Sequence, residues 1–317
     1  MTVGRFAPTP SGRMHLGNAL CALLAYLSAR KAGGEFVLRI EDLDAARCAF
    51  GNNAEILKED LLWLGIRYDR GAEPENYQSR RFSIYENYVR MLAGKRLLYP
   101  CYCSRAELHA ATAPHGRDGI PLYDGHCRIL YDSGKLLAPP GGRKPAYRLR
   151  VPDRIVGFTD GLQGYYSENL ARDAGDFVIR RSDGVYAYHL AVVIDDALAG
   201  VTEVVRGRDL LSSTPRQIYL GEMCGFVPPR YYHIPLLTMP DGRRLSKRDG
   251  DLDIGAFRSA LPSAEPLLGL LGFHAGLLDR AEAVTMPELI SVFSWDKVPR
   301  KDIPLSHESV RRLLTDI

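Results

Sequence analysis

Residues 5–20 read RFAPTPSGRMHLGNAL and place a proline-rich turn directly before a long apolar segment. Leucines recur at helical spacing from Leu16 to Leu27, and Gly33-Gly34 ends the pattern, so we expect a helix over residues 15–32. Residues 2–7 are predicted to form a short buried strand, and the segment EFVLRI after the helix is predicted to form another strand. This β-turn-α-β opening predicts an α/β fold that begins a parallel sheet.

The start of the predicted helix suits an anion. Backbone N–H groups of the turn point at one spot, where the helix dipole favours a phosphate. Gly17 has no Cβ and permits close approach of a ligand, while His15 and Asn18 share one face of the helix. The alternative interpretation is that Ser11 caps the helix and His15 is a surface residue.

Length and composition limit the class of protein. A chain of 317 residues with 46% hydrophobic and 25% charged residues can bury a substantial core, as two domains or as one with inserts. A net charge of +3 permits a nucleic-acid partner without requiring one. Neither a secretory signal nor a run of uncharged apolar residues long enough to span a membrane is present. We therefore expect a cytoplasmic protein without a membrane partner, and a monomer by default.

The amino-acid composition changes in the middle of the chain. Helices are predicted around residues 54–66 and 79–95, whereas residues 96–160 accumulate Pro, Gly, Cys and His and are interpreted as an insertion. A capping-box pattern over Thr214–Gln217 predicts a helix start. HIPLLTM, residues 233–239, is predicted to be a buried strand ended by the following Pro-Asp-Gly turn.

The C-terminal part begins with a basic stretch, DGRRLSKRDGD, at residues 241–251. It is either a solvated basic run or a flexible loop whose Lys247 neutralises charge on a triphosphate. Beyond Asp251 the chain is predicted to be helical, with ELISVFSW and ESVRRLLTDI at helical spacing.

Three cysteines, Cys101, Cys103 and Cys127, lie within 27 residues. In a reduced protein this spacing favours zinc over a disulfide, and thiolate ligands favour a closed structural site. A capping box at Ser104–Glu107 predicts a helix after the first two cysteines. Ligand chemistry alone favours His126 as the fourth ligand, and the alternative is three thiols without a metal.

Two of these stretches resemble motifs of one enzyme class. HLGN at residues 15–18 resembles the His-Ile-Gly-His motif of class I aminoacyl-tRNA synthetases, and RLSKR at 244–248 resembles their Lys-Met-Ser-Lys-Ser loop. Asn18 and Arg244 depart from those motifs. With RFAPTPSG and LRIEDLD, the chain resembles the glutamyl-tRNA synthetase family over nearly its whole length. The resemblance implies a Rossmann-like parallel sheet with a zinc-containing insertion and a short C-terminal helical segment.

The resemblance also implies roles for individual residues. Thr9 stands where serine is usual, Arg5 and Arg206 are the implied carboxylate clamps, and Glu41 is the implied partner of the amino group. From the residues alone, Glu41 could form a surface salt bridge and Tyr188 could belong to the core. The implied glutamate-binding residues are Arg5, Thr9, Glu41, Tyr188 and Arg206. The implied residues for ATP, supplied with Mg²⁺, are His15, Gly17, Asn18, Ser246 and Lys247, of which His15 and Lys247 are catalytic.

The resemblance further implies a catalytic domain over residues 1–250, a stem-contact-like helical segment over 251–317, and no anticodon-binding domain. The spacing of Cys-x-Cys and Tyr-x3-Cys resembles the short branch of the family that modifies queuosine, which favours Tyr123 over His126 as the fourth zinc ligand. That branch activates L-glutamate with ATP and transfers it to the queuosine base at the wobble position of tRNA(Asp). The alternatives are a truncated synthetase that charges tRNA(Glu) and an inactive paralogue that binds tRNA or glutamate.

Overall fold

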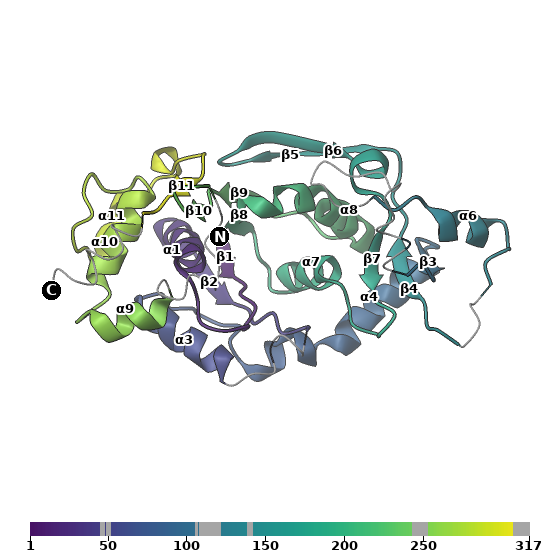
Figure 1. The fold of residues 1–317 in the computed structure, drawn as a ribbon, viewed down its shortest axis with the longest axis horizontal. Helices are drawn as coiled ribbons and strands as arrows, with labels where there is room; N and C mark the ends of the chain where they lie inside the picture. Colours follow the sequence, from purple (N-terminus) through teal and green to yellow (C-terminus); the bar gives the residue numbers. More distant parts are fainter. Residues whose placement is uncertain are drawn as a thin grey trace.

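The protein is an α/β molecule whose described strands form separate parallel and antiparallel sheets (Figure 1). The computed structural model describes residues 1–44, 48, 52–104, 107, 122–137, 142–242 and 253–306. The strands are β1 (Val3–Phe6), β2 (Glu35–Leu38), β3 (Leu98–Cys101), β4 (Ala146–Leu149), β5 (Ile155–Asp160), β6 (Gly164–Asn169), β7 (Phe177–Arg180), β8 (Glu203–Gly207), β9 (Arg230–Ile234), β10 (Leu237–Thr238) and β11 (Ile303–Pro304). The α-helices are α1 (Leu16–Lys31), α3 (Asn53–Trp63), α4 (Phe82–Gly94), α6 (His126–Asp132), α7 (Tyr188–Leu198), α8 (Thr214–Cys224), α9 (Ile254–Ala260), α10 (Glu265–His274) and α11 (Met286–Val292).

The predicted β-turn-α-β opening is confirmed. β1 pairs in parallel with β2, with Val3 opposite Glu35, and α1 connects the two strands. α1 is buried on almost every side because strands lie on one face and the C-terminal helices on the other, which explains why it is apolar nearly all round. Its N-cap is His15 rather than Ser11, since the His15 side chain accepts a hydrogen bond from the backbone of Asn18.

A second parallel pair lies beside the first. β8 pairs in parallel with β9, and the backbone N–H of Thr202 donates to the carbonyl of Val3 at 3.0 Å, which joins β8 to β1. The other sheets are antiparallel (β3-β4-β7 and the hairpin β5-β6) or very short (β10-β11). The described strands thus form small parallel and antiparallel sheets, whereas the sequence predicted one parallel sheet.

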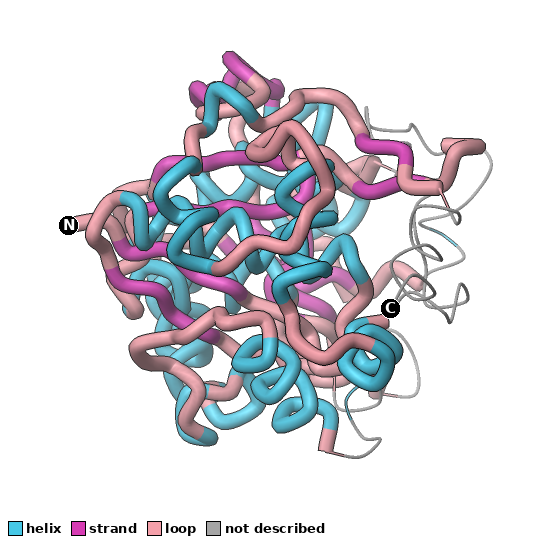
Figure 2. Tube along the Cα trace, turned by 90° about the vertical axis from the view of Figure 1, so that its left-hand side faces the viewer, coloured by secondary structure: helices cyan, strands magenta, loops and turns pink. Residues whose placement is uncertain are grey.

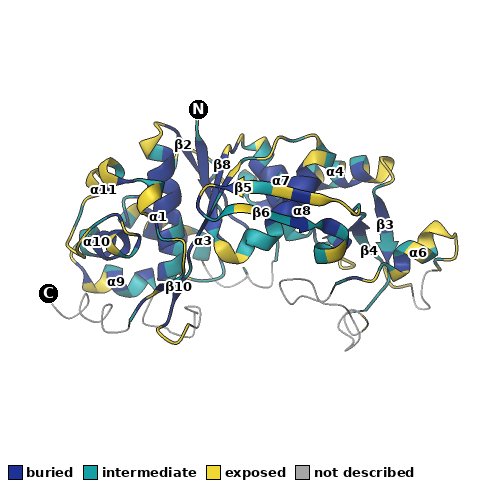
Figure 3. Cartoon of the chain, turned by 90° about the horizontal axis from the view of Figure 1, so that it is seen from above, coloured by how far each residue is buried: buried dark blue, intermediate teal, exposed yellow. Residues whose placement is uncertain are grey.

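The helices divide the molecule into two packed regions. Around α1, the helices α3, α9, α10 and α11 share one hydrophobic core, while α4, α7 and α8 share a second with β3, β4 and β7. Figure 2, seen from the side of α9–α11, shows strands running through the body with helices around them. Seen from above, α1 is buried and the region of α6 projects at the far end (Figure 3). Among the described helices, none is long and apolar enough to cross a membrane.

Two local predictions are wrong. Thr214 is not an N-cap: a 3-10 segment, Arg208–Ser213, runs directly into α8, and the Thr214 hydroxyl is engaged elsewhere. HIPLLTM is not one strand, because β9 ends before Pro235, which has no N–H to donate. The capping box at Ser104 and Glu107 is confirmed by two reciprocal hydrogen bonds. The segment ESVRRLLTDI lies outside the described residues.

Candidate active site

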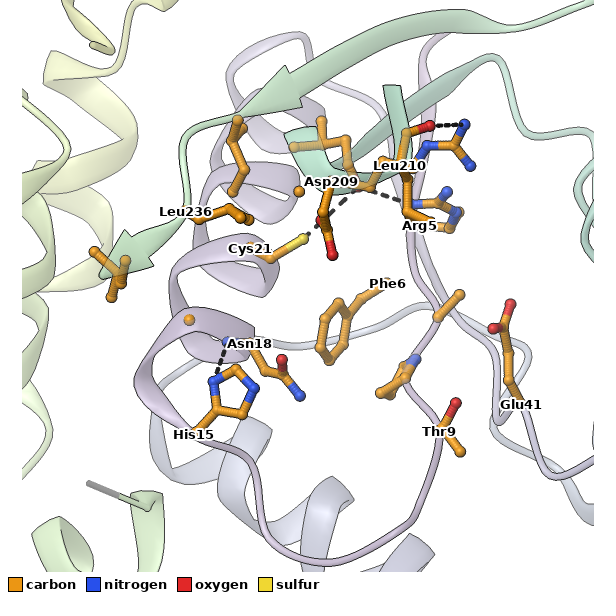
Figure 4. Close-up of a pocket in the computed structure, with 18 of the residues that line it drawn as sticks. Arg5, Phe6, Thr9, His15, Asn18, Cys21, Glu41, Asp209, Leu210 and Leu236 are labelled. Atoms are coloured by element: carbon orange, nitrogen blue, oxygen red, sulfur yellow. Dashed lines mark hydrogen bonds between the residues drawn. The ribbon is translucent and has the colours of Figure 1, made fainter. Parts of the chain in front are cut away.

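A pocket of about 340 Å³ opens where β1 and β8 end and where α1 and α7 begin (Figure 4). Ligands bind at this edge of parallel α/β sheets because loops and helix N-termini converge there. The described residues that line it include all the predicted glutamate-binding residues and three of the predicted ATP-binding residues: Arg5, Thr9, His15, Gly17, Asn18, Glu41, Tyr188 and Arg206. The predicted Ser246 and Lys247 lie outside the described residues.

The N-terminus of α1 forms one wall of the pocket. His15 and Asn18 lie at the start of the helix in Figure 4, with Thr9 and Glu41 across from them. The Nδ1 atom of His15 accepts from the Asn18 N–H at 3.3 Å, so the imidazole folds back over the first turn. A Cβ at Gly17 would lie 3.0 Å from His15 Cε1. Gly17 therefore makes room for the His15 ring itself, in addition to any ligand.

Glu41 belongs to a buried charge network. It is 8% exposed, and Arg39 donates to its Oε1 atom from Nη2 at 2.9 Å and from Nε at 3.3 Å. Arg39 also donates to Asp196, whose Oδ1 lies 3.4 Å from Nε of Arg5. Burial raises the pKa of Glu41, and the charge of Arg39 opposes that rise. Glu41 is therefore not a surface salt bridge.

The two predicted carboxylate clamps have different partners. Arg5 donates from Nη1 to the carbonyl of Val205 at 2.8 Å and approaches Asp196. Arg206, 4% exposed, donates only to neutral acceptors among the described residues. These acceptors are His233 Nε2 at 3.0 Å, Gln217 Oε1 at 2.8 Å, Thr214 Oγ1 at 2.8 Å and the carbonyl of Leu210 at 3.5 Å. The positive charge of Arg206 is thus held in place without a carboxylate.

Tyr188 and Thr9 complete the polar lining. Tyr188 is the first residue of α7, and burial raises the pKa of its hydroxyl. It lines the pocket, so it does more than fill the core. Thr9 is exposed in the turn after β1, where its carbonyl accepts the N–H of Ser11 at 2.8 Å.

The sequence did not indicate several residues at this site. Arg39 and Asp196, which support Glu41 and Arg5, are 157 positions apart and share no motif. Asp209 lines the pocket, and a Cβ at Gly207 would lie 2.5 Å from its Oδ1 atom. The RGRD segment that contains Arg206 and Asp209 is the sequence pattern that could have indicated Asp209. Cys21 also lines the pocket, where burial raises its thiol pKa to about 11, so the thiol stays protonated and acts as a small apolar filler.

A second cluster lies in the region of β3 and α6. The Sγ atoms of Cys101, Cys103 and Cys127 all lie within 4.8 Å of one another, close to the spacing of thiolates around one tetrahedral metal ion. The hydroxyl of the buried Tyr123 lies 3.8 Å from Cys101 Sγ and accepts the Cys127 N–H at 2.7 Å. His126 is exposed at the start of α6 and is not part of the cluster.

Arg148 supports this cluster from β4. Its Nε donates to Cys101 Sγ at 3.3 Å, and its guanidinium lies 3.9 Å from the centre of the Tyr123 ring. Burial opposes ionisation of Cys101, but the hydrogen bond and charge of Arg148 outweigh it and lower the thiol pKa. A guanidinium in this place suits a site rich in anionic ligands, and the sequence did not indicate it.

Comparisons with known proteins find matches over nearly the whole chain. The family model for the catalytic domain of class I tRNA synthetases (E and Q) matches residues 1–301. The glutamyl-Q tRNA(Asp) synthetase of Symbiobacterium thermophilum is 46% identical over 321 residues, covering 99% of this chain and 98% of the relative. That of Nitratidesulfovibrio vulgaris is 43% identical over 319 residues, covering 99% of this chain and 98% of the relative.

Solved structures show the same fold. A glutamate tRNA ligase from Elizabethkingia meningosepticum, in complex with its amino acid, is 28% identical and superposes with a TM-score of 0.79. The match covers 98% of this chain and 68% of that one. Methionyl-tRNA synthetase from Mycobacterium tuberculosis, 15% identical with a TM-score of 0.54, covers 100% of this chain and 69% of its own length and shares the fold alone.

Proposed function

Because the chain belongs to the glutamyl-Q tRNA(Asp) synthetase family of class I tRNA synthetases, we propose that it activates L-glutamate with ATP and transfers the glutamyl group to queuosine in tRNA(Asp). Membership of this family makes the chain a ligase. The observation that carries the proposal for glutamate is the buried Arg206, whose described partners are all neutral, beside the Arg5–Glu41 network in one pocket.

The pocket suits both ends of glutamate. Arg206 and Arg5 bind its carboxylates, because a guanidinium fork pairs with a carboxylate through two hydrogen bonds. Glu41 pairs with the ammonium group, and Thr9 and Tyr188 offer hydroxyls. Glutamine would place an uncharged amide against Arg206 and leave that charge unpaired, which costs roughly 1–3 kcal/mol.

ATP binds against the start of α1. The parallel pairs β1-β2 and β8-β9 act as the Rossmann-like centre that presents this helix, and His15, Gly17 and Asn18 contact the nucleotide. Ser246 and Lys247 of the basic loop contact the phosphates together with Mg²⁺. The glutamate carboxylate attacks the α-phosphate in line and pyrophosphate leaves, while His15 and Lys247 stabilise the developing charge. No residue acts as a nucleophile, so no covalent enzyme intermediate forms.

The cysteine cluster is proposed to hold one structural zinc ion through Cys101, Cys103, Tyr123 and Cys127. The spacing of the sulfur atoms and the burial of Tyr123 support this set over the one with the exposed His126. We assign residues 1–250 to the catalytic domain, with the zinc-bearing insertion at about 96–160, and residues 251–317 to a helical stem-contact-like segment. The enzyme is proposed to act as a monomer in the cytoplasm.

Glutamate-dependent exchange between ATP and pyrophosphate, run without tRNA, tests the activation step. We expect exchange with glutamate, none with glutamine, and none in the Lys247→Ala variant. Absence of glutamate-dependent exchange in the native enzyme would favour the inactive paralogue that binds tRNA or glutamate.

Transfer of labelled glutamate tests the acceptor. We expect label on tRNA(Asp) that contains queuosine, and none on tRNA(Asp) without queuosine or on tRNA(Glu). Charging of tRNA(Glu) would instead identify a truncated glutamyl-tRNA synthetase, and the site of the label on the RNA, base or terminal ribose, distinguishes the two products.

A further inference from the structure

Behind Arg206, a buried histidine and a buried aspartate form a chain of hydrogen bonds that leads away from the pocket. His233 faces Arg206 across the β8-β9 pair, and its Nε2 atom lies 3.0 Å from Arg206 Nε. Its Nδ1 atom lies 2.6 Å from Oδ2 of Asp160, the last residue of β5. His233 is 0% exposed and Asp160 2%, so both act without bulk water.

The partners of His233 determine where its proton resides. Asp160 accepts four backbone N–H bonds from three residues, Leu162 and Gln163 to Oδ1 and His233 to both oxygens, and its pKa is lowered. It is therefore a carboxylate that accepts a hydrogen bond from Nδ1–H of His233. The guanidinium of Arg206 can only donate, so Nε2 must accept. Thr214 Oγ1 also lies 3.1 Å from Nε2, and its hydroxyl can donate to that atom. The contacts with Asp160 and Arg206 are satisfied at once only by the neutral imidazole with its proton on Nδ1.

The other side of Arg206 is held by two groups that are both neutral, Gln217 and His189. Gln217 accepts from Arg206 through Oε1 at 2.8 Å, and its Nε2 lies 3.3 Å from Nδ1 of His189. Burial, together with the charges of Arg216 and Arg206, lowers the pKa of His189 to about 3, so it is neutral and can accept from the amide. The guanidinium thus lies between two neutral imidazole-containing supports, and on the His233 side a carboxylate acts on it only through the imidazole.

We propose that Asp160 and His233 are positioning residues, which aim the Arg206 guanidinium at the carboxylate of the amino-acid substrate. Asp160 acts by holding His233 in the Nδ1–H tautomer, so that Nε2 accepts from Arg206. An acidic residue in direct contact with Arg206 would orient it equally well but would neutralise the charge that the substrate needs. Placing the carboxylate one imidazole away orients the arginine and leaves its charge for the ligand.

The proposal rests on the proposed binding of glutamate, and Asp160→Asn tests it. The amide introduced at this position would keep its oxygen toward the N–H groups of Leu162 and Gln163 and turn its N–H toward His233 Nδ1. The imidazole would then carry its proton on Nε2. The N–H groups of His233 Nε2 and Arg206 Nε would face each other, and the hydrogen bond between them would be lost. We expect the KM for glutamate in pyrophosphate exchange to rise roughly 10- to 100-fold, with the KM for ATP unchanged.

Two variants of His233 keep the test independent of folding defects at Asp160. His233→Gln retains an acceptor for Arg206 and is expected to keep most of the affinity for glutamate, whereas His233→Leu removes the acceptor and is expected to lose it. Tyr232→Phe is the matched control, because Tyr232 lies next to His233 on β9 but packs against Trp295 instead of Arg206. Thermal unfolding of each variant reports its folding.

Each outcome decides between the alternatives. Native enzyme without glutamate-dependent exchange refutes the proposed function itself. Native exchange with an unchanged KM for glutamate in folded Asp160→Asn overturns the positioning role. Equal losses in His233→Gln and His233→Leu also overturn it, because the hydrogen-bond acceptor would then not matter. A rise in the KM for glutamate in Asp160→Asn, with affinity retained in His233→Gln, supports it.

Discussion

Arg206 and Arg5 line the same pocket, but their surroundings assign them different electrostatic roles. Arg5 lies 3.4 Å from Asp196, so part of its charge is compensated within the protein. Arg206 has only neutral partners among the described residues, so its charge is available to a ligand. Burying a guanidinium without a carboxylate as a direct partner is unfavourable in the absence of ligand, and binding of a substrate carboxylate relieves this.

The proposed pairing of Glu41 with the substrate ammonium group predicts that the use of glutamate depends on pH. Because burial raises its pKa, Glu41 takes up a proton at a higher pH than an ordinary glutamate, and the protonated form does not pair with an ammonium group. We expect kcat/KM for glutamate to fall as the pH is lowered toward this raised pKa. Steady-state pyrophosphate exchange between about pH 8 and about pH 5 measures the profile.

Glu41→Gln is the control for that profile. The variant should have a low kcat/KM for glutamate at every pH and should lack the inflection. An unchanged inflection in Glu41→Gln would assign the titration to another group.

If the cysteine cluster holds zinc as proposed, substitutions at the adjacent residues Cys127 and His126 should affect zinc binding differently. Cys127→Ser should lose bound zinc and melt at a lower temperature, because a thiolate ligand and the closed site are both removed. His126→Ala should retain zinc, since His126 is exposed outside the cluster. Zinc per chain, measured by elemental analysis after competition with a chelator, checks both.

The same measurement distinguishes the two candidate fourth ligands. Tyr123→Phe should release zinc at a lower chelator concentration than His126→Ala does. The reverse order would make His126 the ligand.

At the scale of elements, periodicity predicted the long helices well and the short strands poorly. α1, α3 and α4 appear within a few residues of the predicted bounds, because a buried face at helical spacing is a local property of the sequence. The hairpin β5-β6 was not predicted, and one of its strands supplies Asp160. β5 also contacts β9 and α8, and these contacts join segments that are far apart in the sequence.

The packing of α10 depends on one glycine. A Cβ at Gly269 would lie 1.9 Å from the carbonyl oxygen of Glu282, so Gly269→Ala forces the two segments apart. We expect a loss of roughly 1–3 kcal/mol in the free energy of unfolding, measured by urea denaturation.

Gly94 provides the matched helical control. It is exposed at the end of α4, and a Cβ there would meet no atom within 4 Å. Gly94→Ala should be neutral or stabilising by about 0.4–1 kcal/mol, because alanine restricts the unfolded chain. Equal effects of the two substitutions would show that the close approach at Gly269 is unimportant.

At the scale of the whole molecule, His189 links stability to pH. Its pKa is lowered to about 3 by burial and by Arg216 and Arg206, whereas in the unfolded chain it is about 6.5. Between these pH values the unfolded state therefore binds more protons at this histidine than the folded state does. The free energy of unfolding consequently decreases as the pH falls from about 6.5 toward about 3. The slope from this one group is at most about 1.4 kcal/mol per pH unit.

His189→Asn isolates that contribution. Asparagine keeps an acceptor for the Gln217 amide but does not titrate in this range, so its free energy of unfolding should fall less steeply between about pH 6.5 and about pH 4.5. Urea denaturation of both proteins at several pH values measures the difference. Parallel curves would mean that His189 is accessible to protons in the folded state.

The sequence by itself determined the features that depend on neighbours along the chain. The turn and leucine spacing specify α1 and the position of His15, Gly17 and Asn18. The spacing of Cys101, Cys103 and Cys127 predicted one cluster, and the structure brings their sulfur atoms together. The predicted glutamate-binding residues were named from a resemblance, and the structure brings them together in one pocket.

Only the tertiary structure decided how these residues are charged and oriented. Arg39 and Asp196 are 157 positions apart, and Asp160 and His233 are 73 apart, yet each pair meets in a buried site. The sequence predicted Thr214 as a helix cap, but the fold uses its hydroxyl to hold Arg206. Such pairings have no period or spacing in the sequence, because they form between separate elements. Their strength comes from the removal of water when those elements pack together.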